Sequence, residues 1–422
     1  MTARELARRV LERVDRDRAW ATPTLDGELA RANLDDRDRR LASELVYGVL
    51  RHRGRIDRAL AAHADLSRSP PRVVVALRVA AYQLLLLDRV PAYAAVDDAV
   101  GAARSSGGQK LAGFANAVLR KLAPGKEPAL PPAGPDRVAA EFSLPRWIVD
   151  ELAAVVGGDD ELAARAAALA QPASLVARAN RLRSSRADVM ELLATAGAEV
   201  RAIDLAPEAF AVDAGLGDPS RSPSFQSGLW TVQDAGAQLV ALTATPQPGQ
   251  RVLDACAGVG GKATHLAELA GDRALITAAD RSTTKLALGA ETAKRLGLTS
   301  ITPIACDLVD PNAPLGDNYD LIVLDAPCTG LGVLRRHPDA KWRLVPGDVP
   351  RLAEIQARLL DAVAKRLAPS GTLIYSVCTF THAEGPEQAR AFAARSGMQI
   401  VAEHRTWPPD ADAFYLARFA FA

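Results

Sequence analysis

The residues whose type could do covalent chemistry in this 422-residue chain are four cysteines, Cys256, Cys306, Cys328 and Cys378. No two of them form a C-x-x-C pair, so their spacing predicts no zinc site and no other metal centre. The chain starts with Arg- and Glu-rich residues, and its most apolar run, residues 73–87, is short and contains Arg78. We therefore expect a cytoplasmic protein that does not contact a membrane and whose thiols stay reduced.

Two of these cysteines stand just beyond apolar runs that are typical of buried strands. Cys328 follows one run in the sequence Asp325-Ala-Pro-Cys328, and Cys378 follows the next run along the chain. The other two are more typical of packing, because Cys306 lies inside an apolar run and Cys256 lies in a glycine-rich turn. The sequence therefore favours Cys328 and Cys378 as the chemically active pair.

A thiolate with a carboxylate nearby is suited to methylation of cytosine at C5. Cytosine C5 is a weak nucleophile, but a thiolate that adds to C6 turns the ring into an enamine whose C5 can attack a methyl donor. A base must then remove the C5 proton so that the thiol can leave, and a carboxyl group at the N3/N4 edge stabilises the adduct. The pairing of Cys328 and Cys378 at adjacent strand ends, with Asp325 nearby, predicts this reaction.

The chain ahead of these cysteines holds a candidate nucleoside site. One apolar run ends in Asp254 and continues into a glycine-rich turn, where the missing Cβ atoms let a ligand approach the backbone. The next run ends in Asp280, placed to bind a ribose, and the third is followed by Asp307, placed to meet an adenine edge. The turn departs from the dinucleotide pattern, so we expect no pyrophosphate and predict S-adenosylmethionine. For any single element, a glycine turn that only packs a helix on a strand is the alternative.

These residues need a sheet whose strand ends meet at one edge. From residue 233 onward, short apolar runs alternate with helical patterns, which predicts a doubly wound, mostly parallel seven-stranded α/β sheet. The predicted strands are residues 251–254, 274–280, 301–306, 319–325, 371–376, 399–402 and 414–419. The predicted helices between them include residues 261–269, 284–296 and 351–367.

The chain ahead of this sheet divides into three predicted parts. Apolar residues repeat at helical spacing up to about Leu122, which predicts an all-helical domain. A Pro-rich stretch follows and predicts an extended linker, and beyond Pro145 the pattern indicates a small α/β segment. The predicted domains are residues 1–123 (all-helical), 124–145 (linker), 146–232 (small α/β subdomain) and 233–422 (catalytic domain).

The charge distribution favours a polyanionic partner for the first part of the chain. Residues 1–130 carry 23 Lys and Arg against 16 Asp and Glu, whereas the whole chain has a net charge of +1. A solvated helical surface would have the same composition. In the small α/β segment, Arg178, Asn180 and Arg181 are either RNA contacts or a local set of salt bridges, and we favour the first interpretation.

Several stretches of the chain resemble a known family. VLDACAGVGGKATHLAE, LIVLDAPCTGLGVLRRHPDAKWR and GTLIYSVCT are similar to motifs of the ribosomal RNA small-subunit methyltransferase B group of RNA 5-methylcytosine methyltransferases. LVARANRLRSS and GLWTVQDAGAQL resemble that group's segments ahead of the catalytic core. ELVYGVLRHRGRID, AYQLLLLDRVPAYAAVDDAV and GFANAVLRKL are similar to its domain related to the antitermination factor NusB. The resemblance covers nearly the whole chain.

The resemblance implies a Rossmann-like methyltransferase that acts on a cytosine of 16S rRNA, conventionally position 967, before the small subunit is fully assembled. It implies that Cys378 is the nucleophile and that Cys328 assists release of the product. Asp325 would also touch the cytosine edge, and Lys262 is a weaker candidate for a catalytic or positioning role. We expect a monomer with RNA as its partner. The residues expected around S-adenosylmethionine are Cys256, Ala257, Gly258, Val259, Gly260, Gly261, Lys262, Asp280, Asp307 and Asp325.

The chain departs from the family pattern at three places. Val259 stands where the cofactor loop usually has a proline, which could loosen that loop, and Leu331 replaces the usual threonine. After Cys378 the usual Glu-Asn is missing, and the chain reads Glu384-Gly-Pro-Glu387. None of these changes removes a reacting group, so we expect activity.

Other functions predict different features. A DNA cytosine-C5 methyltransferase would use Cys328 as its nucleophile, would not need Cys378 and would carry a large target-recognition insert. An inactive RNA-binding protein would have no reason to keep both cysteines and three aspartates at the strand ends. A small-molecule methyltransferase would leave the helical domain unexplained. A methyltransferase acting on tRNA or on another rRNA cytosine remains open.

Overall fold

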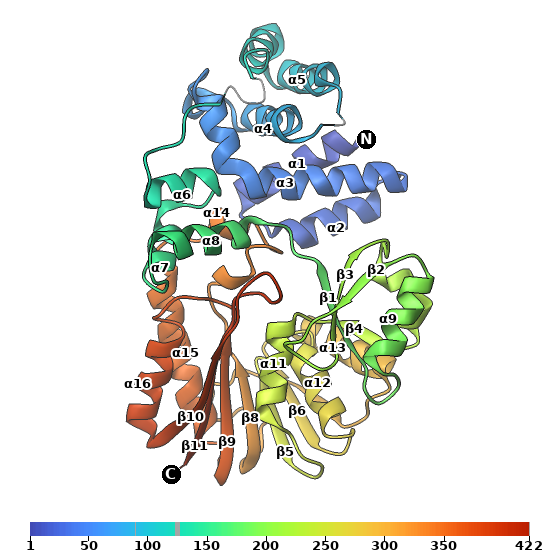
Figure 1. The fold of residues 1–422 in the computed structure, drawn as a ribbon, viewed down its shortest axis with the longest axis vertical. Helices are drawn as coiled ribbons and strands as arrows, with labels where there is room; N and C mark the ends of the chain where they lie inside the picture. The colour runs from blue at the N-terminus through green and yellow to red at the C-terminus, as the bar shows by residue number, and fades with distance from the viewer. Residues whose placement is uncertain (89, 123–126, 422) are drawn as a thin grey trace. The chain divides into compact units, whose positions relative to one another are not determined.

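The computed structural model describes residues 1–88, 90–122 and 127–421, so the predicted linker residue Pro124 lies outside the described residues. The chain forms two compact units (Figure 1). The helical unit consists of residues 1–171 together with Leu334–Leu344. The catalytic unit consists of residues 172–333 and 345–422.

The helical unit is built around a core of leucine, valine and alanine side chains from its first five α-helices. Helix α1 begins with a capping box in which Thr2 and Glu5 satisfy each other's backbone N–H groups, and it buries Leu6, Val10 and Val14 on one face. The helices are α1 (Ala3–Asp17), α2 (Ala21–Arg31), α3 (Asp36–Ala61), α4 (Pro71–Leu86), α5 (Ala92–Leu119), α6 (Pro135–Glu141), α7 (Arg146–Ala153) and α8 (Asp159–Ala170), with a 3-10 turn η1 (Leu66–Arg68).

Part of the predicted linker is helical. We expected residues 124–145 to be extended, but Pro135–Glu141 form α6, with Pro135 in its first turn. Proline fits the first turn of a helix because its missing N–H would have no partner there. The next helices, α7 and α8, also pack in the helical unit.

The segment Leu334–Leu344 is distant in sequence from the rest of the helical unit but is packed within it. It contains the short helix α14 (Ala340–Arg343), and Trp342 packs against the helical core. Nε1 of Trp342 donates to the carbonyl oxygen of Leu50 at 2.6 Å, and Nζ of the buried Lys341 donates to that of Arg51 at 2.7 Å. These bonds join the segment to the middle of α3.

The catalytic unit begins with a small antiparallel sheet of order β2-β3-β1-β4. Its strands are β1 (Leu175–Ala179), β2 (Glu199–Ala202), β3 (Ala209–Ala214) and β4 (Trp230–Val232). The apolar patterns at residues 174–180, 199–205 and 209–212 predict the first three, whereas β4 was not predicted. Helix α9 (Arg186–Thr195) begins at a capping box of Ser185 and Asp188. The loop between β3 and β4 holds η2 (Pro219–Arg221) and α10 (Pro223–Gln226).

The predicted seven-stranded sheet is confirmed, with the order β10-β11-β9-β8-β5-β6-β7. Neighbouring strands from β9 to β7 are parallel, and β11 pairs antiparallel with both β9 and β10. The strands are β5 (Arg251–Ala255), β6 (Leu275–Asp280), β7 (Ile301–Ala305), β8 (Tyr319–Asp325), β9 (Leu367–Val377), β10 (Met398–Arg405) and β11 (Tyr415–Phe421).

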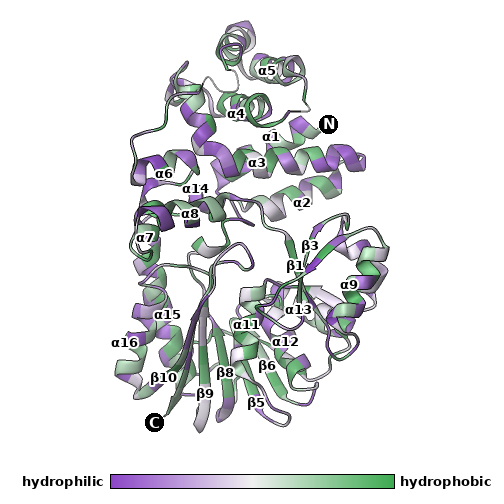
Figure 2. Cartoon of the chain, viewed as in Figure 1, coloured by the Kyte–Doolittle hydropathy of each residue, from purple (hydrophilic) through white to green (hydrophobic). Residues whose placement is uncertain are grey.

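Helices cover both faces of this sheet, because its central strands are apolar on both sides (Figure 2). In β8, Leu321 and Val323 pack with α11, α12 and α13, whereas Ile322 and Leu324 face the side of α15 and α16. The helices are α11 (Ala235–Ala244), α12 (Gly261–Leu269), α13 (Thr283–Leu296), α15 (Asp348–Ala364) and α16 (Pro386–Ser396), and a 3-10 turn η3 (Leu331–Val333) follows β8. Among the described residues, none of the helices combines the length and the apolar character needed to cross a bilayer.

Candidate active site

The two cysteines that sequence reasoning paired do lie together. Sγ of Cys328 and Sγ of Cys378 are 3.4 Å apart, and both residues are partly exposed. They meet because β8 and β9 are parallel neighbours, with Asp325 in register with Ser376. Loops that leave the same ends of adjacent parallel strands emerge side by side.

Asp325 is held from two sides at this strand edge. Its Oδ2 accepts a hydrogen bond of 2.6 Å from Nζ of Lys262, and its Oδ1 accepts one of 2.9 Å from the hydroxyl of Ser376. The Lys262 side chain is 10% exposed and that of Asp325 is 32% exposed. The structure therefore brings the predicted residues Lys262 and Asp325 into contact and adds Ser376, which the sequence analysis did not identify.

The pKa values of Cys328 and Lys262 are both raised, but for different reasons. The hydrogen bond with Cys378, followed by burial, raises the pKa of Cys328 well above its ordinary value, so Cys328 holds its proton. Burial lowers the pKa of Lys262, but the charge of Asp325 outweighs it and the net shift is upward, so the lysine stays charged. Burial also raises the pKa of Asp254, at the end of β5, to about 7, although Lys262 acts in the opposite direction.

The predicted cofactor loop connects β5 to α12. Gly258 and Gly260 have φ angles of 55° and 78°, which other residues adopt only with strain. A Cβ on Gly260 would lie 3.1 Å from Cα of Gly289, whereas a Cβ on Gly258 would meet no atom closer than 3.9 Å. Gly260 is therefore needed for close packing of α13, while the space over Gly258 is open to a ligand. Val259, in the position of the usual proline, is 53% exposed.

The remaining predicted cofactor residues lie along the same strand ends. Asp280 ends β6, and its two carboxyl oxygens accept backbone N–H groups of Gly258 at 2.9 Å and Ser282 at 2.8 Å. Asp307 follows β7 and lies 3.6 Å from Nη2 of Arg281. Burial raises the pKa of Cys256 above its ordinary value, in keeping with the packing role expected of this residue.

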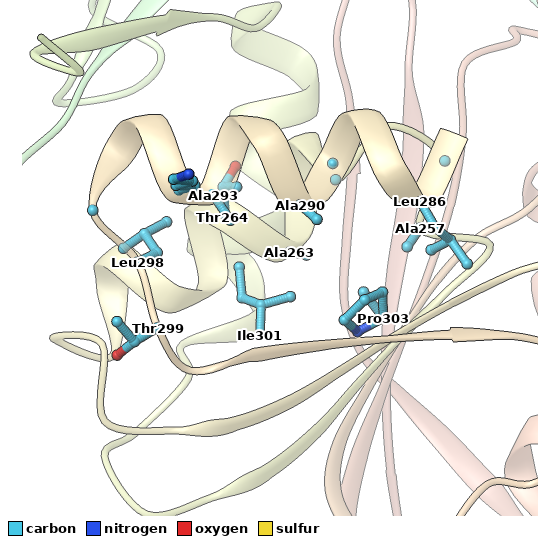
Figure 3. Close-up of a pocket in the computed structure, with 16 residues that line it drawn as sticks. Ala257, Ala263, Thr264, Leu286, Ala290, Ala293, Leu298, Thr299, Ile301 and Pro303 are labelled. Atoms are coloured by element: carbon cyan, nitrogen blue, oxygen red, sulfur yellow. The ribbon is translucent and has the colours of Figure 1, made fainter. Parts of the chain in front are cut away.

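A separate cavity of about 260 Å³ lies behind the cofactor loop (Figure 3). It is lined by residues of α12, α13, β6 and β7, and Ala257, Gly258 and Gly260 form its wall on the loop side. Neither thiol lines it, and neither does Lys262 or Asp325. This cavity is distinct from the cluster of reactive groups.

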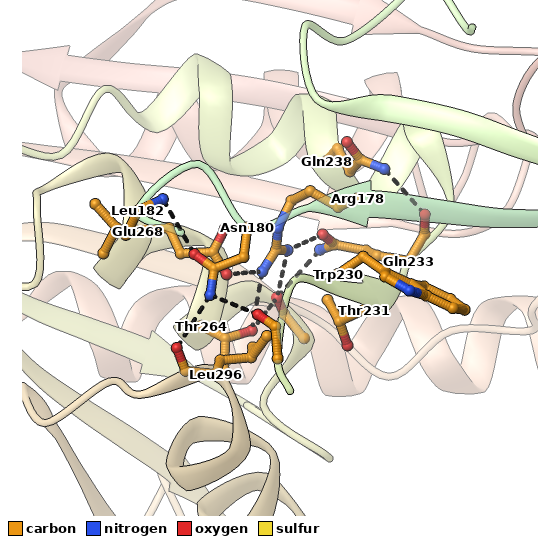
Figure 4. A network of polar contacts seen from close by, with 12 residues as sticks. Arg178, Asn180, Leu182, Trp230, Thr231, Gln233, Gln238, Thr264, Glu268 and Leu296 are labelled. Atoms are coloured by element: carbon orange, nitrogen blue, oxygen red, sulfur yellow. Dashed lines mark hydrogen bonds and ion pairs between the residues drawn. The ribbon is translucent and has the colours of Figure 1, made fainter. Parts of the chain in front are cut away.

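The RNA contacts that we favoured in the small α/β segment are wrong for two of the three residues. Arg178 is fully buried and forms an ion pair of 2.8 Å with the equally buried Glu268 (Figure 4). Asn180 is also fully buried, and its Nδ2 donates to the carbonyl oxygens of Gly228 and Leu296. These side chains join the small sheet to α12 and α13, so neither can reach RNA. Arg181 is largely exposed and lies 3.6 Å from Glu208.

Two further residues near the thiols were missed by sequence reasoning. The backbone N–H of Gly332 donates to the carbonyl oxygen of Cys378 at 3.0 Å, and Gly332 accepts from the N–H of Ala413 at 3.1 Å. The buried Glu384 accepts a hydrogen bond from the backbone N–H of Thr329, the residue after Cys328. The signal for Glu384 was a carboxyl group six residues after Cys378, which we interpreted only as the remnant of an incomplete family motif.

Comparison with known sequences identifies the family. Residues 241–420 match the family described as 16S rRNA methyltransferase RsmB/F, residues 1–124 match the NusB family, and residues 144–216 match the RsmF/B-like ferredoxin-like domain. A protein of Synechocystis sp. named probable ribosomal RNA small subunit methyltransferase B is 35% identical, over 96% of this chain and 90% of that protein. A Bacillus subtilis protein of the same name is 33% identical, over 97% and 90% respectively. The chain belongs to the RsmB/F methyltransferase family.

Solved structures support the fold of this RsmB/F family member. The structure of PH0851 superposes with a TM-score of 0.84 at 21% identity and covers 100% of this chain and 99% of that one. The structure of NSun6 from Pyrococcus horikoshii with SFG has a TM-score of 0.60 at 20% identity, over 65% of this chain and 98% of that one. At these identities the similarity establishes the fold.

The cofactor of this methyltransferase is S-adenosylmethionine. The strand ends fit such a molecule, because Gly258 leaves open space where a Cβ would project and the carboxyl groups of Asp280 and Asp307 follow neighbouring strands. A sulfonium methyl donor carries positive charge, and Asp325 lies at the adjacent strand end. Asp280 and Asp307 are the residues that would hold the nucleoside.

Proposed function

We propose that this chain methylates C5 of a cytosine in 16S rRNA, conventionally position 967, through a covalent adduct with Cys378. The observation that carries the proposal is the 3.4 Å contact between the thiols of Cys328 and Cys378 beside the Lys262–Asp325 pair. A non-enzymatic RNA-binding protein would have no need for two thiols and an ion pair at one strand edge.

The contact between the two thiols is compatible with a division of roles. A protonated Cys328, 3.4 Å from Sγ of Cys378, is close enough to donate a hydrogen bond to a thiolate on Cys378. Sγ of Cys378 then adds to C6 of the cytosine, and C5 gains the electron density needed to accept a methyl group. Bound S-adenosylmethionine supplies that methyl group.

Release of the product requires two further events. A base removes the proton from C5, the electron pair of that C–H bond forms the C5–C6 double bond, and the bond between C6 and Cys378 breaks. Cys328, 3.4 Å from the departing sulfur, is placed to assist this elimination. Asp325, fixed by Lys262 and Ser376, is placed to contact the N3/N4 edge of the ring. The target base must leave its stack to reach these groups.

The test is to trap the adduct on RNA. The protein is incubated with S-adenosylmethionine and a 16S rRNA fragment that carries 5-fluorocytidine, in which fluorine blocks elimination. We expect a covalent protein–RNA band from the wild type and none from Cys378→Ala. Cys328→Ala should give a band even on unmodified RNA, because addition proceeds and release is slow.

A matched control is Cys306→Ala, which removes a thiol that contacts neither member of the pair and should trap like the wild type. Loss of the adduct in Cys328→Ala with retention in Cys378→Ala would reverse the two roles. No adduct from the wild type, on this RNA or on tRNA, would refute the proposed reaction.

A further inference from the structure

The side chain of Glu384 is fully buried, and both oxygens of its carboxyl group accept hydrogen bonds from the protein. Its Oε1 accepts from the backbone N–H of Thr329 at 2.8 Å and from Nε2 of Gln356 at 3.1 Å. Its Oε2 accepts from the hydroxyl groups of Thr329 at 2.6 Å and Thr381 at 3.0 Å. Four donors therefore converge on one buried side chain.

Three of these four donors come from the two cysteine loops. Thr329 directly follows Cys328, and Thr381 lies three residues after Cys378. The hydroxyl groups of Thr329 and Thr379 are 3.0 Å apart, which adds a direct contact between the loops. Glu384 thus accepts hydrogen bonds both from the loop that follows Cys328 and from the loop that follows Cys378.

A second layer of contacts fixes Glu384 itself. Nε2 of Gln356, on α15, also donates to the carbonyl oxygen of Pro327 at 3.0 Å. The hydroxyl of Tyr375, on β9, is 2.5 Å from the carbonyl oxygen of Glu384 and 3.0 Å from Oε1 of Gln356. The carboxyl group therefore has little freedom to move independently of the sheet.

We propose that Glu384 is a positioning residue that sets the separation of the Cys328 and Cys378 thiols. Burial of a carboxyl group is unfavourable unless every polar atom is satisfied, and an apolar side chain would serve better if packing alone mattered. The network instead specifies one relative placement of two loops. The inference rests on the proposed function, because a fixed separation matters only if the two thiols act on one base.

A readout that depends on the thiols alone separates this role from general stabilisation. A bis-alkylating reagent such as dibromobimane becomes fluorescent only when it has joined two thiols, so the rate of fluorescence gain reports their juxtaposition. Peptide mapping then assigns the cross-link to Cys328 and Cys378. The assay needs neither RNA nor S-adenosylmethionine.

Three variants make the test specific. Glu384→Ala removes all four acceptor contacts. In Glu384→Gln, the amide oxygen can still accept from the N–H groups of Thr329 and Gln356. The amide NH2 group then faces the hydroxyl groups of Thr329 and Thr381, which can rotate and accept instead of donating. Glu387→Ala removes an exposed carboxyl group three residues away and is the matched control.

We expect the wild type and Glu387→Ala to cross-link equally fast, and Glu384→Gln to stay within about tenfold of them, as for the loss of one hydrogen bond. Glu384→Ala should cross-link much more slowly, and its kcat should fall by roughly 100-fold, the effect of a displacement of about 1 Å. Its KM for RNA should not change, because a fully buried side chain cannot contact the substrate.

The proposal would be overturned if a folded Glu384→Ala variant cross-linked and turned over at wild-type rates. It would also be overturned if Glu384→Gln cross-linked as slowly as Glu384→Ala. If Glu384→Ala does not fold, Thr329→Val, which removes one hydroxyl donor and keeps the side-chain shape, should slow the cross-link, and an unchanged rate would contradict us. Failure of the wild type to modify cytosine would refute the proposed function but would leave the cross-linking result intact.

Discussion

The Sγ atoms of Cys328 and Cys378 lie 3.4 Å apart although fifty residues separate them in the sequence. The contact follows from the parallel pairing of β8 and β9, and the loops beyond these strands are then fastened to each other by Gly332 and Glu384. The site is therefore a property of two loops that cannot move independently.

Gly332→Ala should displace the Cys378 loop. A Cβ on Gly332 would lie 1.9 Å from the carbonyl oxygen of Ala413 and 2.9 Å from that of Cys378, so the backbone must shift. We expect about 1–3 kcal/mol of destabilisation, as for other overpacked sites, and loss of the trapped adduct in the protein that folds. Gly101→Ala, in α5, is the control, because nothing lies within 4 Å of its added methyl group. Normal trapping by Gly332→Ala would show that the loop tolerates displacement.

Lys262→Met should impair methyl transfer while preserving the fold. The variant removes the 2.6 Å contact that orients Asp325, and we expect kcat to fall by about 100-fold, as for loss of one preorganised electrostatic contact. Because the pKa of Lys262 is raised, the lysine stays protonated between pH 7 and 10. Its titration should therefore cause no loss of wild-type activity in this range. Lys285→Met, which changes an exposed lysine, is the control for charge. Single-turnover rates on RNA measure the effect, and a twofold change or less would exclude a role for Lys262.

Lys341 should make the stability of the helical unit depend on pH. Burial, with a contribution from the charge of Arg51, lowers the pKa of Lys341 to about 7, against 10.5 for an unperturbed lysine. Between these values the unfolded chain binds more protons than the folded chain, so the free energy of unfolding should rise with pH from about 7 to about 10.5.

The measurement for Lys341 is a comparison with Lys341→Met. Hydrogen exchange of α3 amides at pH 7 and pH 9 gives the opening free energy of the unit for both proteins. The wild type should gain stability over this interval relative to the variant, and equal gains would contradict the predicted titration.

Arg178→Ala should destabilise the catalytic unit strongly, because it leaves Glu268 buried without its partner. We expect a loss of about 3–5 kcal/mol in the free energy of unfolding, measured with denaturant. Arg181→Ala, three residues along the chain, should change it by no more than about 0.5 kcal/mol, because its contact with Glu208 is partly solvated. If Arg178→Ala had only a mild effect on stability but weakened RNA binding, Arg178 would be an RNA contact after all.

Local patterns were sufficient to predict the strands of the large sheet and the pairing of the two cysteines. Each strand of the large sheet is a short apolar run, and residues that follow neighbouring parallel strands must lie near one another. The fold class and the adjacency of Cys328 and Cys378 are consequences of that regularity. The three-residue strand β4 was missed because so short a run has no periodicity to detect.

Other features depend on contacts that local patterns do not encode. Arg178 was interpreted as a surface cation, but its partner Glu268 is 90 residues away, and only the packing of the small sheet on α12 brings them together. The Pro-rich segment was interpreted as extended, although Pro135 starts α6, because proline ends some helices and begins others. Glu384 was seen only as a departure from a motif, since its four donors come from separate segments of the chain.

The excursion of Leu334–Leu344 into the helical unit has a consequence for how this protein can be divided. The backbone leaves the catalytic unit after Val333 and rejoins it at Val345, so no single cut separates the two units. A fragment ending at residue 171 would lack Trp342 and Lys341 in its interior, and the complementary fragment would carry these two side chains without their hydrogen-bond partners in α3. The helical unit is therefore made from two separate segments of the chain. A chimera that takes this unit from a relative would need the relative's counterpart of the eleven residues Leu334–Leu344 as well.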